Sequence, residues 1–218
     1  MLTYLADGHQ AAKWLELRNL ARLYDFMTSS FVLWQIQQSP PLTIEFVREL
    51  NFYAAHHLAP APGTLRSVHQ CNVKITDTDH VPPPFEQVDA LMEDFIQTVH
   101  NLNQTEVPSY VAAYALWRLN WIHPFAQGNG RTSRAVCFFI LCQRYNLWFP
   151  GTPILPELIR RDRAEYCALL TAADKTIGAN GLPDLTEIQA FLELRLQEQM
   201  STVQQESLQE EPAAAAAS

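Results

Sequence analysis

The stretch HPFAQGNGRTSR, from His123 to Arg134, decides both the fold and the chemistry expected of this chain. Gly128 and Gly130 allow backbone angles closed to other residues, so successive N–H groups around Asn129 can point at one anion. The apolar run that follows, AVCFFILCQRY, has no Gly or Pro and predicts a helix whose first turn faces the same anion. The sequence therefore predicts a phosphate-holding loop at the start of a helix.

Three side chains of this stretch have chemistry suited to a phosphate ligand. Arg131 and Arg134 stand three residues apart on one face of the predicted helix, close enough to bind adjacent phosphates with paired N–H donors. His123 ends the preceding apolar segment, and it is the one residue of the stretch that can move a proton near neutral pH. A lone glycine turn or a lone histidine is usually structural, but their combination in one loop favours a binding site.

Hydrophobic periodicity elsewhere predicts a mainly α fold with one small β-hairpin. The segment 109–120 is apolar nearly all round, which places it at the centre of a domain with His123 at its end. The segment 72–80 alternates apolar and polar residues around the turn sequence TDTD, and it predicts the hairpin. Further helices are expected at 9–37 with a break at Thr28–Ser30, and at 42–57, 156–173 and 184–200.

Composition limits the class of protein. The chain has 218 residues, of which 48% are hydrophobic, and a formal net charge of -8, so it is expected to fold around one core without a nucleic-acid partner. No apolar run reaches the ~20 residues of a membrane span, which predicts a cytoplasmic protein, although an exported bacterial effector would look the same. The four cysteines show no metal-ligand spacing, which indicates reduced thiols.

The stretch from His123 to Arg134 resembles the signature HPFx(D/E)GNGRxxR of the Fic family, and it departs from that pattern only at Gln127. The resemblance extends from about Leu42 to about Leu196 and includes Gly63 and Arg66 in the family's Gly-x-x-Arg turn. It implies a Fic-type helical bundle in which 39–200 is the Fic domain. Residues 1–38 are expected to form an N-terminal helical segment, and 201–218 a helix end with a disordered tail.

The resemblance implies a nucleotidyltransferase that moves AMP from ATP to a Ser, Thr or Tyr hydroxyl of a target protein. In such an enzyme His123 would be the general base, and Phe125 would anchor the loop in the core. The N–H groups of Gly128, Asn129 and Gly130 would form the anion hole for the diphosphate.

Other residues receive roles from the same resemblance. Arg131 and Arg134 would neutralise the outer phosphates. Tyr166 would border the base pocket, although a core or rim tyrosine is nearly as well supported. Val73, Lys74 and Ile75 would form the edge of a flap that pairs with an extended segment of the target protein.

Gln127 stands where the family has the Asp or Glu that holds Mg²⁺. A hard dication prefers anionic oxygen, so the amide oxygen of Gln127 is expected to hold Mg²⁺ or Mn²⁺ only weakly. Three interpretations stay open: a slower AMP transferase, an enzyme with another metal or donor (phosphate, UMP or phosphocholine), and a degenerate domain that binds a nucleotide or a partner without transfer.

The terminal segments bear on regulation and assembly. Many Fic proteins carry an inhibitory helix with the pattern (S/T)xxxE(G/N), but no glutamate stands four residues after Thr28, Ser29 or Ser30. Thr202 and Glu206 have the right spacing, and Ser207 then breaks the pattern. We therefore expect either no intramolecular inhibition or an inhibitory partner in trans. The terminal helices could cover the core or form a homodimer face.

Overall fold

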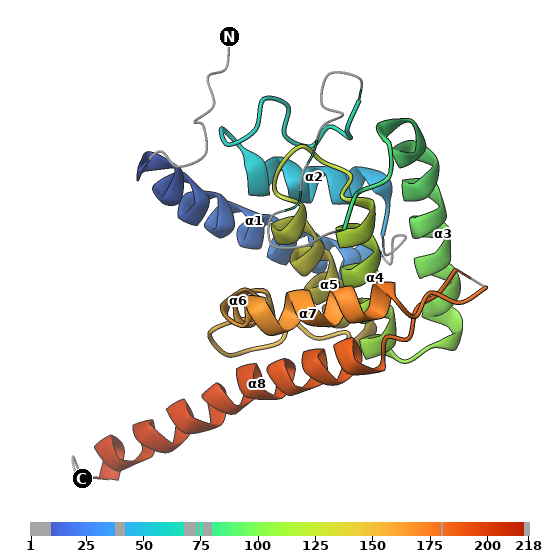
Figure 1. Cartoon of the computed structure of the whole chain (residues 1–218). Coiled ribbons are helices and arrows are strands. Elements are labelled where there is room, and N and C mark those ends of the chain that lie inside the picture. Colours follow the sequence, from blue (N-terminus) through green and yellow to red (C-terminus); the bar gives the residue numbers. More distant parts are fainter. Residues whose placement is uncertain are drawn as a thin grey trace.

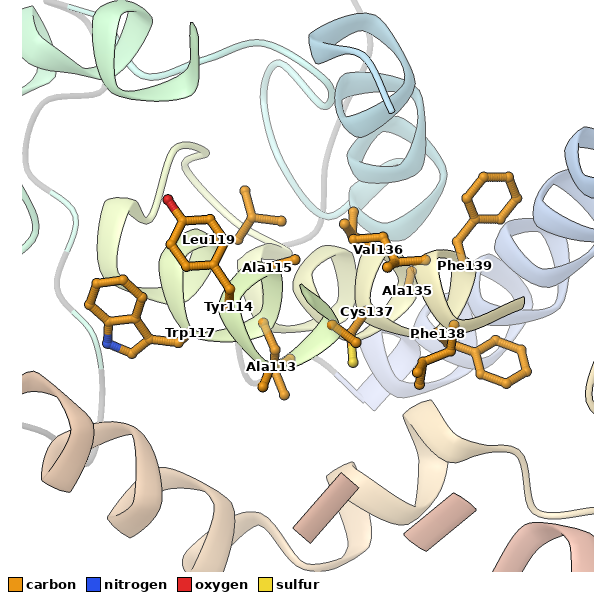
Figure 2. Close-up of a cluster of buried hydrophobic side chains, with 14 of the residues drawn as sticks. Ala113, Tyr114, Ala115, Trp117, Leu119, Ala135, Val136, Cys137, Phe138 and Phe139 are labelled. Atoms are coloured by element: carbon orange, nitrogen blue, oxygen red, sulfur yellow. The ribbon is translucent and has the colours of Figure 1, made fainter. Parts of the chain in front are cut away.

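Two consecutive apolar helices form the centre of the molecule: α4 (Pro108–Ile122) and α5 (Asn129–Tyr145). Pro108 opens α4 at the one helical position where a missing N–H costs nothing. The side chains of both helices project on all sides, as Figure 2 shows for Tyr114, Trp117 and Phe138, and most of them are buried. This central pair confirms the all-round apolar pattern predicted for 109–120.

The remaining helices surround this pair (Figure 1). Each buries one face; in α3, for example, Val88, Met92, Phe95 and Val99 recur at helical spacing and are fully buried. Figure 1 shows α8 running along one side of the domain, where it packs against α4, α6 and α7. The bounds are α1 (Gln10–Gln37), α2 (Ile44–Ala55), the 3-10 helix η1 (Phe85–Gln87), α3 (Val88–Thr105), α6 (Leu155–Arg161), α7 (Arg163–Asp174) and α8 (Thr186–Ala215).

The computed structural model describes residues 10–37, 42–67, 73, 75, 80–179 and 181–215, with side chains up to 203. The mainly α class is confirmed. Most of the expected hairpin at 72–80, including Lys74, lies outside the described residues, and Val73, Ile75 and His80 belong to no regular element. Within the described part of the chain, the only β contact is an isolated antiparallel bridge between Leu65 and Phe125.

Two helices differ from their predicted extents. The break expected at Thr28–Ser30 is wrong, because α1 is continuous there and Thr28 Oγ1 donates to the Tyr24 carbonyl at 2.9 Å. The single helix expected at 156–173 is interrupted at Asp162, which separates α6 from α7. The segment boundaries at 38 and 200 stay predictions, and α8 continues across the second of them.

None of the described helices combines the length and apolar character that crossing a membrane requires.

Candidate functional site

The turn after α4 fixes the position of His123. Its backbone is left-handed, with φ 50° and ψ 58°, and its N–H donates to the Leu119 carbonyl at 3.0 Å. Arg66 holds this turn: its Nε donates to the His123 carbonyl at 2.8 Å and its Nη2 to the Ile122 carbonyl at 3.1 Å. The guanidinium thus satisfies carbonyls that a helix end leaves without partners.

The His123 side chain lines a cavity, but much of its ring is buried. Burial is the main cause that lowers the pKa of His123 to about 4, and smaller contributions in the same direction come from Arg66 and the nearby His80. A backbone interaction with Asn120 acts in the opposite direction, although Nδ1 has no partner in good hydrogen-bond geometry. The imidazole is therefore neutral at pH 7 and able to accept a proton.

The loop between His123 and α5 is locked from within by Asn129. The Asn129 side chain accepts from the Phe125 N–H at 2.9 Å and donates to the Phe125 carbonyl at 2.8 Å. Phe125 itself is buried in the core. Both ends of the Asn129 amide are thus used within the loop, which fixes the loop conformation, and the backbone N–H of Asn129 stays available to an incoming anion.

A second asparagine, Asn51 of α2, connects the loop to the rest of the domain. It is buried, and its Nδ2 donates to the Gln127 carbonyl at 2.8 Å and to Thr132 Oγ1 at 3.1 Å. Its Oδ1 accepts from the Gly63 N–H at 2.9 Å. Sequence reasoning missed Asn51, because an asparagine within an amphipathic helix gives no signal of what it faces.

Gly128 must be glycine for two reasons. Its φ of 82° is left-handed, and a Cβ there would lie 3.0 Å from Asn51 Nδ2 and 3.2 Å from the Ala55 Cβ. The close approach of α2 and the loop therefore depends on this residue. The N–H groups of the first turn of α5, which follows directly, have no intrahelical partners.

The two arginines of the first turns of α5 differ in their surroundings. Arg131 forms an ion pair with Glu16 of α1, with Nη1 and Oε1 3.3 Å apart. Arg134 is only 8% exposed and forms no ion pair with any described acidic side chain. Burial lowers the pKa of its guanidinium, and only the phenol groups of Tyr166 and Tyr24 oppose that effect. A buried cation without a carboxylate is costly, so this arrangement is typical of a site that binds an anion.

These residues surround one cavity of about 450 Å³, which is large enough for a nucleotide. The glycine loop and the arginines form one part of its wall. Another part is aromatic, where Trp117 Nε1 donates to Asp174 Oδ1 at 2.7 Å beside Trp121 and His80. Of the site residues expected from the sequence, the cavity is lined by His123, Gln127, Gly128, Asn129, Gly130, Arg131, Arg134, Tyr166 and Ile75.

Tyr166 of α7 lies in the wall of this cavity and is 4% exposed. Its hydroxyl accepts from Asn120 Nδ2 at 2.7 Å, and burial raises its pKa. The structure therefore ties Tyr166 to α4, beside the turn that holds His123. Phe125 lies behind the cavity in the core, and Val73 is not among the lining residues.

The groups around Gln127 are a poor match for Mg²⁺. The described residues include no group of three His, Cys, Asp or Glu side chains placed to hold a metal. Two carboxylates of the described residues line the cavity, but Glu16 is paired with Arg131 and Asp174 accepts from Trp117. Mg²⁺ is usually held by one or two carboxylates together with phosphates and water, and this wall offers an amide.

Fold and cavity together define a helical protein with an arginine-lined pocket at a glycine loop. The family model Fic/DOC matches residues 41–141, which span α2 to α5 and the whole loop. The chain belongs to the Fic/DOC family.

Relatives and solved structures agree with this assignment. The chain is 32% identical over 142 residues to "Protein adenylyltransferase Fic" of Nematostella vectensis, and 30% identical over 171 residues to the protein of that name from Drosophila persimilis. The alignments cover 64% and 78% of this chain but 30% of each relative, so the chain spans about a third of their length.

The fold is also similar to a Fic domain containing signaling protein from Bacteroides thetaiotaomicron, with a TM-score of 0.66 and 22% identity over 87% of this chain and 74% of that one. Fic-1 from C. elegans gives a TM-score of 0.65 and 21% identity over 96% and 55% of the two chains. At 21% and 22% identity, the similarity to these two solved structures shows a shared fold.

Proposed function

We propose that this chain is a nucleotidyltransferase that moves AMP from ATP to a Ser, Thr or Tyr hydroxyl of a target protein. One observation carries the proposal: neutral His123 and Arg134, which has no carboxylate partner among the described residues, line the same cavity beside the glycine loop. The relatives named protein adenylyltransferase support the same chemistry.

In the proposed reaction the imidazole of His123 accepts the proton of the attacking hydroxyl. The hydroxyl oxygen forms a bond to the α-phosphorus of ATP, the bond from that phosphorus to the bridging oxygen breaks, and pyrophosphate leaves. The N–H groups at Gly128 and Gly130 and the guanidinium groups of Arg131 and Arg134 stabilise the charge on the phosphates. A bound polyphosphate would also raise the pKa of His123 from about 4, making it a stronger base.

The rest of the site fits the same proposal. The aromatic wall near Tyr166 would take the nucleoside, and Val73, Lys74 and Ile75 would present the target segment. Gln127 would make at most a weak contact with Mg²⁺ or Mn²⁺. The activity would reside in 39–200, in the cytoplasm, and the flanking segments 1–38 and 201–218 would contribute to a homodimer face or to the binding of an inhibitory partner in trans.

One observation favours a second candidate function. Because Gln127 replaces the family's carboxylate, the domain could bind a nucleotide or a partner protein without transferring AMP. The two candidates predict the same nucleotide binding and differ only in covalent labelling.

Labelling separates them. The full chain is incubated with a lysate and with ATP labelled at either the α- or the γ-phosphate. We expect protein-bound label from the α position only, and none with His123→Ala. Binding of ATP without label in any protein would support the binding module, while label from the γ position would indicate phosphate transfer. Gln127→Glu is expected to raise the labelling rate with Mg²⁺ present, and loss of label in this variant would contradict the metal argument.

A further inference from the structure

Four arginines line the cavity, in a chain whose net charge is -8. Arg131 and Arg134 come from α5, while Arg160 and Arg163 come from the junction of α6 and α7. Among the described residues, the carboxylates that line the same space are those of Glu16 and Asp174. The described part of the wall therefore has more arginines than carboxylates, and two of the four arginines lie outside the stretch from His123 to Arg134.

The arginines at the α6–α7 junction point in two directions, toward the cavity or toward α8. Arg160 and Arg163 line the cavity, whereas Arg161 between them pairs with Glu198 of α8 and with Asp162, the latter at 2.7 Å. Arg195 of α8 also takes Asp162, at 2.6 Å. The carboxylates of Asp162 and Glu198 are thus bound on the α8 side, and Arg160 makes no ion pair with any described side chain.

Like charges are close together on the cavity side. The pKa of Arg134 is lowered mainly by burial, and the charges of Arg131 and Arg160 lower it further. Such a cluster is unfavourable when empty, and an anion of several charges relieves it. A triphosphate has that property, and guanidinium groups bind its oxygens with directed pairs of N–H donors.

We propose that Arg160 and Arg163 neutralise the phosphates of the nucleotide in place of a divalent cation, so that this chain binds ATP without metal. The proposal rests on the function proposed above. It follows from two features of one wall: the amide of Gln127 and the paired state of Glu16 and Asp174 make a poor Mg²⁺ site, while two additional arginines reach the same cavity. Two guanidinium groups supply the two positive charges that one Mg²⁺ would bring.

The test is calorimetric titration of the full chain with ATP, once in EDTA and once with excess Mg²⁺. We expect wild type to bind in EDTA and to gain less than about threefold in affinity from Mg²⁺. Arg160→Ala and Arg163→Ala should each weaken binding in EDTA about tenfold or more, as expected for charge-assisted hydrogen bonds. Arg161→Ala is the matched control, because it removes a neighbouring arginine that faces α8, and its ATP affinity should equal that of wild type.

The outcomes distinguish this inference from the proposed function. Binding only when Mg²⁺ is added would overturn the inference and leave the proposed function standing. Equal binding by wild type, Arg160→Ala and Arg163→Ala in EDTA would also overturn it. If ATP binds under neither condition, both fail. Thermal unfolding of each variant shows whether the fold is intact, and Arg160→Gln and Arg163→Gln serve as second variants that keep most of the side-chain length.

Discussion

Arg134 and Arg195 are two largely buried arginines with opposite surroundings. Arg195 of α8 lies 2.6 Å from Asp162 and 2.9 Å from Glu165, and its guanidinium covers the ring of Phe191. Arg134 of α5 is buried to a similar degree and has no carboxylate partner among the described residues. One arginine therefore joins α8 to the α6–α7 junction, while the other is held in a cavity wall where an incoming anion can compensate its charge.

Exchanging each arginine for methionine should separate these two roles most clearly. Arg134→Met removes an uncompensated buried charge, so the free energy of unfolding should stay equal or rise, while ATP affinity falls about a thousandfold. Arg195→Met should lower the free energy of unfolding by about 1–3 kcal/mol and leave ATP affinity unchanged. Urea unfolding and calorimetric titration measure both quantities. Destabilisation by Arg134→Met with unchanged ATP binding would show that Arg134 is structural.

His123 extends the comparison of Arg134 with Arg195, because its side chain is also buried but can lose its positive charge. The pKa of His123 is about 4 in the folded chain, whereas the ordinary pKa of histidine, which applies to the unfolded chain, is 6.5. Between pH 4 and pH 6.5 the unfolded chain therefore binds a proton that the folded chain does not. The free energy of unfolding should therefore fall as pH decreases from 6.5 to 4, with up to about 3 kcal/mol due to this one group. Urea unfolding of wild type and His123→Gln at pH 7 and pH 4.5 isolates that share. If wild type loses no more stability than His123→Gln between pH 7 and pH 4.5, the lowered pKa of His123 is contradicted.

Asn51 tests whether the loop depends on its support from α2. Asn51→Ala leaves the Gln127 carbonyl and the Gly63 N–H without this partner, so it should cost about 1–3 kcal/mol of stability and weaken ATP binding about tenfold. Asn19→Ala is the control: Asn19 is equally buried, but its side chain donates to the His56 carbonyl at 2.8 Å and not to a group of the loop. Equal losses of ATP affinity in both variants would show a general effect of instability.

The sequence predicted the parts of the molecule whose signal is local. All-round apolarity identified α4, and the glycines with Arg131 and Arg134 identified the loop and the start of α5. Residues that act across the chain could not be found in this way. Asn51 lies 76 positions from the Gln127 carbonyl that it binds, and Glu16 lies 115 positions from Arg131.

Helix boundaries show the same limit. The polar run at Thr28–Ser30 suggested a break, but Met27 and Phe31 bury their side chains in the core and hold the turns on both sides of it. No Gly or Pro marks the split at Asp162 in the sequence. Asp162 pairs there with Arg161 and with Arg195 of α8, a helix that is distant in sequence. At both places tertiary contacts, rather than the local sequence pattern, determine whether the helix continues or ends.

The smallest expected effect concerns Glu16, whose carboxylate forms an ion pair with Arg131 at the cavity wall. Glu16 is about half exposed, so the pair is weak, and a phosphate that binds Arg131 competes with it. Glu16→Gln should raise ATP affinity about two- to fivefold, because the competing charge is gone while the side chain keeps its size. Asp94→Asn is the matched control, since Asp94 forms a similar exposed pair with Arg118 at 3.2 Å outside the cavity wall. A loss of ATP affinity in Glu16→Gln would show instead that Glu16 positions Arg131 for the ligand, and the pair would then belong to the binding site.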